Sequence, residues 1–130
     1  MLKILTVDDS AIVAERLREM LSEMPDVAYR GNATNIAGAL KLAKKEMPHV
    51  VILDIHLESE MPNANGINLL ISLRKLYADL KIVMLTNLAE DQYRNTCLFL
   101  GADYFLDKSH EFEKIPHIIK ELNQPKVAMI

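Results

Sequence analysis

The stretch PHVVILDIHLESEMPNANG, residues 48–66, contains a short apolar run that ends on a carboxylate. Residues 50–53 are four consecutive apolar residues, and Asp54 follows them directly. A run of this length, rich in β-branched residues and without polar alternation, is typical of a strand buried on both faces of a parallel sheet. We therefore expect Asp54 at the end of a buried strand, where the chain emerges from the core.

Other strand-length apolar runs alternate with stretches of helical spacing along the chain. Strong runs occur at 4–7 and 82–85, and weaker ones at 27–29 and 104–106. Apolar stripes that recur every three or four residues predict helices between and after these strands. The stripes are Val13, Leu17, Met20, Leu21 and Met24; Ile36, Leu40 and Ala43; Ile67, Leu70 and Ile71; Tyr93, Cys97 and Leu100; and Ile115, Ile118, Ile119 and Leu122.

Polar and proline residues indicate where several of these helices begin. Ser10, Asn35 and Asp91 are suited to cap a helix or to stand in its first turn. Pro116 suits a first-turn position, so the last helix is predicted to start near Ile115. The resulting order, strand then helix repeated, predicts a doubly wound α/β domain with a parallel sheet covered by helices on both faces. We expect one domain over 1–123 and a short tail, 124–130.

Composition excludes several classes of function. The 130 residues, half hydrophobic and a quarter charged, suit a single domain. A net charge of −3, with Lys and Arg scattered among acids, argues against direct nucleic acid binding. The single cysteine excludes an internal disulfide and a Cys-rich zinc site. No apolar run reaches the roughly 18 residues of a membrane span, and the N-terminus lacks signal-peptide character, so a cytoplasmic protein is expected.

Polar residues follow the predicted strands at one edge of the sheet. They are Asp8, Asp9, Asp54, Thr86 and Lys108. Ligands of doubly wound sheets bind beyond the carboxyl ends of the strands. Three carboxylates at that edge repel one another by about 4 kcal/mol for each pair at ~4 Å and an effective dielectric constant of ~20. Lys108 offsets part of this repulsion, and an all-oxygen ligand set favours Mg²⁺ or Mn²⁺ over zinc.

This arrangement predicts phosphoryl transfer. A carboxylate such as Asp54 can attack phosphorus and form an acyl phosphate, while a metal ion and Lys108 neutralise the phosphoryl oxygens. Thr86 can then hydrogen-bond the new phosphoryl group. The added negative charge can be read by any segment that moves toward it.

The motifs VDDS, VVILD, PNANG, MLTN and GADYFLDKS occur in this order, and the chain from about residue 3 to 122 resembles the receiver domain of two-component response regulators. The resemblance implies a flavodoxin-like (βα)5 fold with strand order 2-1-3-4-5. It also implies a phosphoryl donor, either a sensor histidine kinase or a phosphotransfer protein. Such a protein catalyses its own phosphorylation and dephosphorylation, but it acts as a signalling protein rather than as a turnover enzyme.

The resemblance also assigns roles to individual residues. By position they are Asp8 and Asp9 as the acidic pair for Mg²⁺, Asp54 as phosphoacceptor, His56 as a metal ligand through its backbone carbonyl, Thr86 as switch hydroxyl, Phe105 as switch aromatic and Lys108 as phosphate-binding lysine. In this family the positions of His56, Asn87 and Leu88 tune the access of hydrolytic water. Because an apolar Leu88 cannot orient a water molecule, we predict a long-lived phosphoryl group.

One departure from the family pattern lies beside Asp54. The family's proline and glycine are expected four and eight residues after the phosphoacceptor, but Pro62 and Gly66 each come four residues later. This spacing indicates a four-residue insertion, either 58–61 or 57–60. A solvated bulge is one interpretation, since surface loops tolerate insertions. The other is that the two glutamates of the insertion alter metal affinity or kinase docking.

The sequence leaves open which target receives the signal, and it leaves two alternative functions open. The chain is expected to act on a downstream protein or on an output domain that it does not include, and residues 91–122 are a candidate homodimer surface. One rival is a pseudo-receiver, a binding module that keeps the fold without phosphorylation. The other is a haloacid dehalogenase-type phosphatase, whose second acid would stand at the position of His56.

Overall fold

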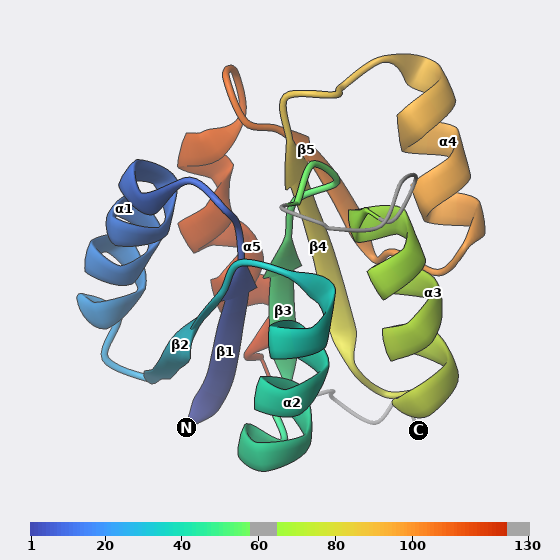
Figure 1. Ribbon diagram of the computed structural model, residues 1–130. Coiled ribbons are helices and arrows are strands. Elements are labelled where there is room, and N and C mark those ends of the chain that lie inside the picture. Colours follow the sequence, from blue (N-terminus) through green and yellow to red (C-terminus); the bar gives the residue numbers. More distant parts are fainter. Residues whose placement is uncertain (58–64, 125–130) are drawn as a thin grey trace, which may run out of the picture.

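A computed structural model describes residues 1–57 and 65–124 and shows a central parallel sheet (Figure 1). Its strand order is β2-β1-β3-β4-β5, and every neighbouring pair is parallel. The strands are β1 (Leu2–Val7), β2 (Val27–Ala33), β3 (Val50–Leu53), β4 (Lys81–Thr86) and β5 (Tyr104–Asp107). The predicted doubly wound sheet and its strand order are therefore confirmed.

Helices cover both faces of the sheet, as Figure 1 shows. The elements are α1 (Ala11–Ser22), α2 (Ile36–Glu46), α3 (Gly66–Leu76), α4 (Asp91–Phe99), the short 3₁₀ helix η1 (Phe112–Lys114) and α5 (Ile115–Leu122). Two separate apolar clusters result: α2, α3 and α4 pack on one face, and α1 and α5 on the other. Burial of these two faces fixes which side of each strand points to which helices.

The predicted helix starts agree with the structure. Ser10 and Asn35 are the N-caps of α1 and α2, where their side chains accept hydrogen bonds from Val13 N at 3.4 Å and Gly38 N at 2.7 Å. Asp91 is a first-turn acid of α4, and α5 begins at Ile115. These caps satisfy backbone N–H groups that a helix cannot pair internally.

Strand β2 is longer than its apolar run indicated. The sequence predicted a strand over 27–29, but the strand continues to Ala33 through the polar segment Arg30–Gly31–Asn32. An edge strand needs an apolar side chain only where it faces the core, so periodicity underestimates its length. The extension carries β2 up to the end of β1.

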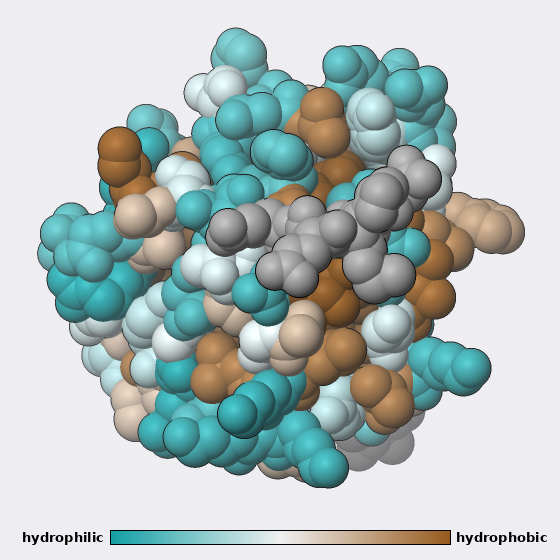
Figure 2. All heavy atoms as spheres, viewed as in Figure 1, coloured by the Kyte–Doolittle hydropathy of each residue, from teal (hydrophilic) through white to brown (hydrophobic). Residues whose placement is uncertain are grey.

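Hydrophilic side chains cover most of the face shown in Figure 2, and hydrophobic ones gather beside α3. The sequence leaves open whether Tyr93, Phe99 and Phe112 of the 91–122 segment serve a dimer or the core. In the structure Phe112 is buried, Tyr93 is half-buried and Phe99 is exposed. Only Phe99 among these three therefore offers its ring to a partner. No helix in residues 1–57 and 65–124 has both the length and the apolar character needed to cross a bilayer.

Arg74 joins the end of α3 to the segment that leads into β5. Its guanidinium donates to the carbonyl of Gly101 from Nη2 at 2.7 Å, to the carbonyl of Leu80 from Nη1 at 2.6 Å and to Asp103 Oδ2 at 2.9 Å. The carbonyl of Ala78 accepts a further bond from Nη1 at 2.9 Å. One side chain thus satisfies several backbone carbonyls that have no helical partner.

Arg74→Ala is expected to lower the free energy of unfolding by about 2–4 kcal/mol, because several charge-assisted hydrogen bonds are lost together. Urea denaturation measures this change. Arg74→Lys is the matched control and should recover less than half of the loss, since one ammonium cannot reproduce the planar fork. Equal stability of the lysine variant and the wild type would contradict this role for the guanidinium.

Candidate functional site

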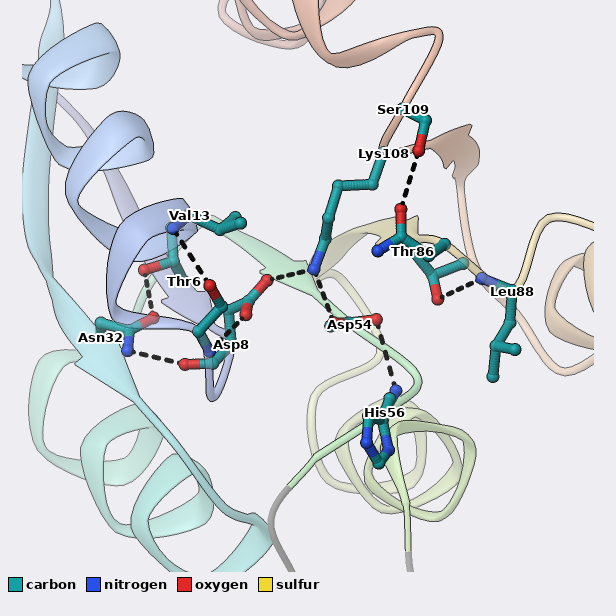
Figure 3. Close-up of polar contacts among 12 residues, drawn as sticks. Thr6, Asp8, Val13, Asn32, Asp54, His56, Thr86, Leu88, Lys108 and Ser109 are labelled. Atoms are coloured by element: carbon teal, nitrogen blue, oxygen red, sulfur yellow. Dashed lines mark hydrogen bonds and ion pairs between the residues drawn. The ribbon is translucent and has the colours of Figure 1, made fainter.

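The carboxyl ends of the strands bring the predicted site residues to one edge of the sheet (Figure 3). Asp8 follows β1, Asp54 follows β3, Thr86 ends β4 and Lys108 follows β5. A cavity of about 480 Å³ opens there. Its lining residues are Asp9, Ser10, Asp54, His56, Thr86, Asn87, Leu88 and Lys108.

Lys108 is the cationic centre of the cluster. Its Nζ donates to Asp54 Oδ2 at 2.7 Å and to Asp8 Oδ2 at 2.8 Å, and all three side chains are at most 10% exposed. Burial alone would lower the pKa of Lys108, but the hydrogen bonds and negative charges of Asp54 and Asp8 raise it above its ordinary value. The ammonium is therefore held in its charged form at neutral pH.

The carboxylates form a group that fits a hard cation. Asp8, Asp9 and Asp54 each offer an oxygen, and these oxygens lie within 4.8 Å of one another. Burial raises the pKa of Asp8, although Lys108 and the Ser10 N–H, which donates to Asp8 Oδ1 at 2.8 Å, oppose the shift. Asp9 is exposed to solvent. This donor set consists of oxygen atoms and includes an exposed ligand, which suits Mg²⁺ or Mn²⁺.

The residues around Asp54 and Thr86 define the cavity wall. The N–H of His56 donates to Asp54 Oδ1 at 3.3 Å, and the His56 side chain is exposed. Thr86 is completely buried, and its Oγ1 accepts a hydrogen bond from the N–H of Leu88 at 3.1 Å. Leu88 also packs against the core cluster on the α2, α3 and α4 face. The threonine hydroxyl is therefore held at the cavity by a backbone group.

Two residues outside the predicted site stand directly against it. Ser109 Oγ donates to Asn87 Oδ1 at 3.0 Å and joins the loops after β4 and β5. Arg94 of α4 places its guanidinium 5.0 Å from the centroid of the buried Phe105 ring and donates to the Phe105 carbonyl at 3.2 Å. Sequence patterns gave no signal for either contact, since both join residues of separate elements.

Gly66 lies directly against the backbone of Asp54. A Cβ atom at residue 66 would lie 1.9 Å from the carbonyl oxygen of Asp54 and 2.7 Å from Cα of Ile55. The Gly66 N–H donates to the carbonyl of Ile55 at 2.6 Å. The glycine of the PNANG motif is therefore needed for close approach of α3 to the site. The predicted insertion, 58–61 or 57–60, lies outside the described residues except for Leu57, which is buried.

The comparisons with known proteins agree with this geometry. The family model of the response regulator receiver domain matches residues 4–120. The chain therefore belongs to the response regulator receiver domain family, the receivers of two-component systems. This membership favours the receiver prediction over a dehalogenase-type phosphatase.

Individual relatives include both curated proteins and solved structures. A protein-glutamate methylesterase/protein-glutamine glutaminase of Treponema pallidum is 33% identical over 107 residues, which cover 81% of this chain and 26% of that protein. Response regulator GacA of Pseudomonas aeruginosa is 28% identical, with 94% of this chain and 55% of that protein covered. The chain thus spans about a quarter to just over half of the length of these two relatives.

Two solved structures share the fold along nearly the whole chain. The response regulator domain of Thermotoga maritima CheB has a TM-score of 0.80 at 28% identity and covers 95% of each chain. The non-phosphorylated HemR receiver domain of Leptospira biflexa has a TM-score of 0.81 at 27% identity, covering 99% of this chain and 100% of that one.

Proposed function

We propose that this receiver accepts a phosphoryl group on Asp54 from a phosphohistidine of a sensor histidine kinase or phosphotransfer protein. The observation that carries this proposal is the position of the Asp54 carboxylate, which lines the cavity and accepts a hydrogen bond from Lys108, whose side chain is 10% exposed. A carboxylate at such a place can reach a phosphoryl donor that docks over the cavity. The lysine is already in position to neutralise negative charge.

The proposed transfer has a simple balance of bonds. A carboxylate oxygen of Asp54 attacks phosphorus, an O–P bond forms and the N–P bond of the donor histidine breaks. The electron pair of that bond returns to the imidazole nitrogen, which is then protonated from solvent. Lys108 stabilises the charge of the transferred group throughout, and the product is an acyl phosphate on Asp54.

The proposed metal ligands are the carboxylates of Asp8, Asp9 and Asp54, with the backbone carbonyl of His56 as a fourth. Mg²⁺ or Mn²⁺ bound there would supply positive charge to the phosphoryl oxygens. The chain's own contribution is to hold the carboxylates close together. The hydrogen bonds from Lys108 and from the Ser10 N–H fix the orientation of the Asp8 carboxylate.

The signal is proposed to pass through Thr86 and Phe105. A phosphoryl group on Asp54 offers Thr86 a strong new acceptor, so the threonine hydroxyl can turn toward it and Phe105 can change its packing. The change is proposed to be recognised by a downstream protein or an output domain, and residues 91–122 are the proposed homodimer surface. We place the protein in the cytoplasm, where such a kinase would phosphorylate it.

Intact-protein mass after incubation with acetyl phosphate and Mg²⁺ tests this function. The wild type should gain one phosphoryl group, and the gain should be absent in Asp54→Asn and in the presence of EDTA. Absence of any gain in the wild type, with acetyl phosphate and with a matched kinase, would favour a pseudo-receiver instead.

Leu88→Glu is expected to shorten the lifetime of the phosphoryl group by about tenfold, because a carboxylate at the cavity wall can orient and deprotonate an attacking water. The decay of the acyl phosphate after removal of the donor measures this lifetime. Leu88→Met keeps the apolar wall and should decay as the wild type does. A glutamate variant that decays no faster would argue against water access as the controlling factor.

A further inference from the structure

A polar network lies on the α1 side of the sheet beneath the proposed metal ligands. Thr6 of β1 is completely buried, in a strand whose other central residues are apolar. Its Oγ1 lies 2.9 Å from the hydroxyl of Tyr29 and 2.8 Å from Oδ1 of Asn32. Asn32 Nδ2 in turn donates to the backbone carbonyl of Asp8 at 3.0 Å (Figure 3). The network therefore connects the interior of the sheet to the Asp8–Asp9 peptide.

The donors and acceptors of this network fit one arrangement. An amide oxygen can only accept, and the carbonyl of Gly31, the other acceptor near the Thr6 hydroxyl, lies 3.5 Å away. Thr6 therefore donates to the closer Asn32 Oδ1, and Tyr29 donates to Thr6. The orientation of the Asn32 amide follows, with its NH₂ group toward the Asp8 carbonyl. A flipped amide would place its oxygen against that carbonyl oxygen, which is repulsive.

A bulge in β2 brings Asn32 to this place. The register pairs Ile4 with Tyr29 but Thr6 with Asn32, so β2 contains one residue more than β1 over this interval. Gly31, within the bulge, has a φ of +121°, a conformation that side chains rarely adopt. A one-residue shift of register moves a side chain to the opposite face of a sheet, and bulges next to functional sites redirect side chains in this way.

Two hydrogen bonds to β2 fix the backbone of Asp8, one of the proposed metal ligands. The Asp8 N–H donates to the carbonyl of Ala33 at 3.0 Å, and the Asp8 carbonyl accepts from the Asn32 side chain. Both backbone groups of Asp8 are therefore tied to β2. The Asp8 carbonyl belongs to the peptide between Asp8 and Asp9. The orientation of this peptide therefore determines the backbone positions from which the side chains of Asp8 and Asp9 extend.

We propose that Asn32, oriented by Thr6 and Tyr29, is a positioning residue that preorganises Asp8 and Asp9 for a divalent cation. This inference rests on the proposed function, in which these carboxylates hold Mg²⁺. Asn32 acts through the backbone of Asp8 and does not itself contact the ion. Residues that orient metal ligands in this way typically change metal affinity by one to two orders of magnitude when they are lost.

Titration of the ¹⁵N-labelled protein with Mg²⁺, followed by NMR, measures the affinity without any phosphorylation. Thr6→Val keeps the shape of the side chain but removes the hydroxyl, and it should weaken Mg²⁺ binding by about tenfold. Thr6→Ser retains the hydroxyl and should bind as the wild type does. Asn32→Ala should lose at least as much as Thr6→Val, and the double variant should lose no more than Asn32→Ala alone, because Thr6 acts through Asn32.

Kinetics give a second readout. The Mg²⁺ concentration for half-maximal phosphorylation should rise in Thr6→Val, while the maximal rate stays that of the wild type. If Thr6→Val fails to fold, Mg²⁺ binding is measured in Asn32→Ala and Tyr29→Phe, both on the edge strand. Weaker binding in these variants supports the positioning role of Asn32, and wild-type binding in both overturns it.

The contrary results for Mg²⁺ affinity distinguish failure of the positioning role of Asn32 from failure of the proposed metal site. Wild-type affinity in Thr6→Val and Asn32→Ala, with normal binding by the wild type, would overturn the positioning role alone. An equal loss in Thr6→Val and Thr6→Ser would do the same, because it would reflect packing rather than the hydroxyl. Absence of Mg²⁺ binding by the wild type would overturn the proposed metal site as well.

Discussion

Lys108→Met is expected to lower the free energy of unfolding by about 3 kcal/mol in the absence of divalent cations, because it leaves the buried carboxylates of Asp8 and Asp54 without their cation. Added Mg²⁺ should stabilise this variant more than it stabilises the wild type, since the ion would supply the missing positive charge. Thermal unfolding with and without Mg²⁺ measures both effects.

The sign of the pH dependence follows from the raised pKa of Lys108. A lysine whose pKa is higher in the folded state stabilises that state at all pH values below its ordinary pKa, and the contribution is lost as the pH rises through the raised value. The wild type should therefore keep this stabilisation at neutral pH. The deficit of Lys108→Met should shrink in acid, where Asp8, whose pKa is raised by burial, takes up a proton and no longer needs the cation.

Lys114→Met is the matched control. Lys114 pairs with Glu111 at 2.8 Å, but its side chain is 64% exposed. An exposed pair contributes about 0–1 kcal/mol, so this variant should unfold close to the wild type. Equal stability of the two methionine variants would contradict the role of Lys108 as the counter-ion of a buried cluster.

Gly66→Ala is expected to disrupt both the fold and the site. Because the new Cβ would lie 1.9 Å from the Asp54 carbonyl oxygen, either α3 or the end of β3 must move. We expect a loss of about 3 kcal/mol in the free energy of unfolding. We also expect phosphorylation to slow by on the order of a hundredfold in protein that is still folded, since small displacements of a reacting group have effects of this size.

Gly38→Ala makes the same substitution in the first turn of α2, and it serves as the control. There the nearest atom to a new Cβ is Asn35 Oδ1 at 3.1 Å, a side-chain atom that can move slightly. Its stability should change by less than about 1 kcal/mol, since alanine is also the better helix former. Urea denaturation and the rate of phosphorylation separate the two variants, and similar behaviour would contradict the close contact at Gly66.

The ends of β1 and β3, and the polar residues that follow β1, β3 and β5, could be predicted from the sequence because their signals are local. The apolar run before Asp54 and the motif around Lys108 each identify a strand and the polar residue that follows it. Parallel pairing then brings these residues together, and the structure places Asp54 and Lys108 within 2.7 Å of each other. Their proposed chemical roles rest on family resemblance and on this proximity.

Other features depend on contacts between distant segments and had no local signal. The bulge at Gly31, which redirects Asn32 toward Asp8, arises from the pairing of β1 with β2. The guanidinium of Arg94 over Phe105 depends on how α4 packs against β5. Gly66 was recognised by its place in a motif, but its contact with the Asp54 backbone requires the packing of α3.

The central claim is that Asp54 carries the phosphoryl group, and borohydride trapping followed by peptide mass spectrometry tests it most directly. Borohydride reduces an aspartyl phosphate to homoserine but leaves an unmodified aspartate unchanged. After incubation with acetyl phosphate and Mg²⁺, homoserine should replace aspartate at residue 54 and at no other position. Homoserine at another aspartate, or a phosphorylated protein in which residue 54 is still aspartate, would contradict the account.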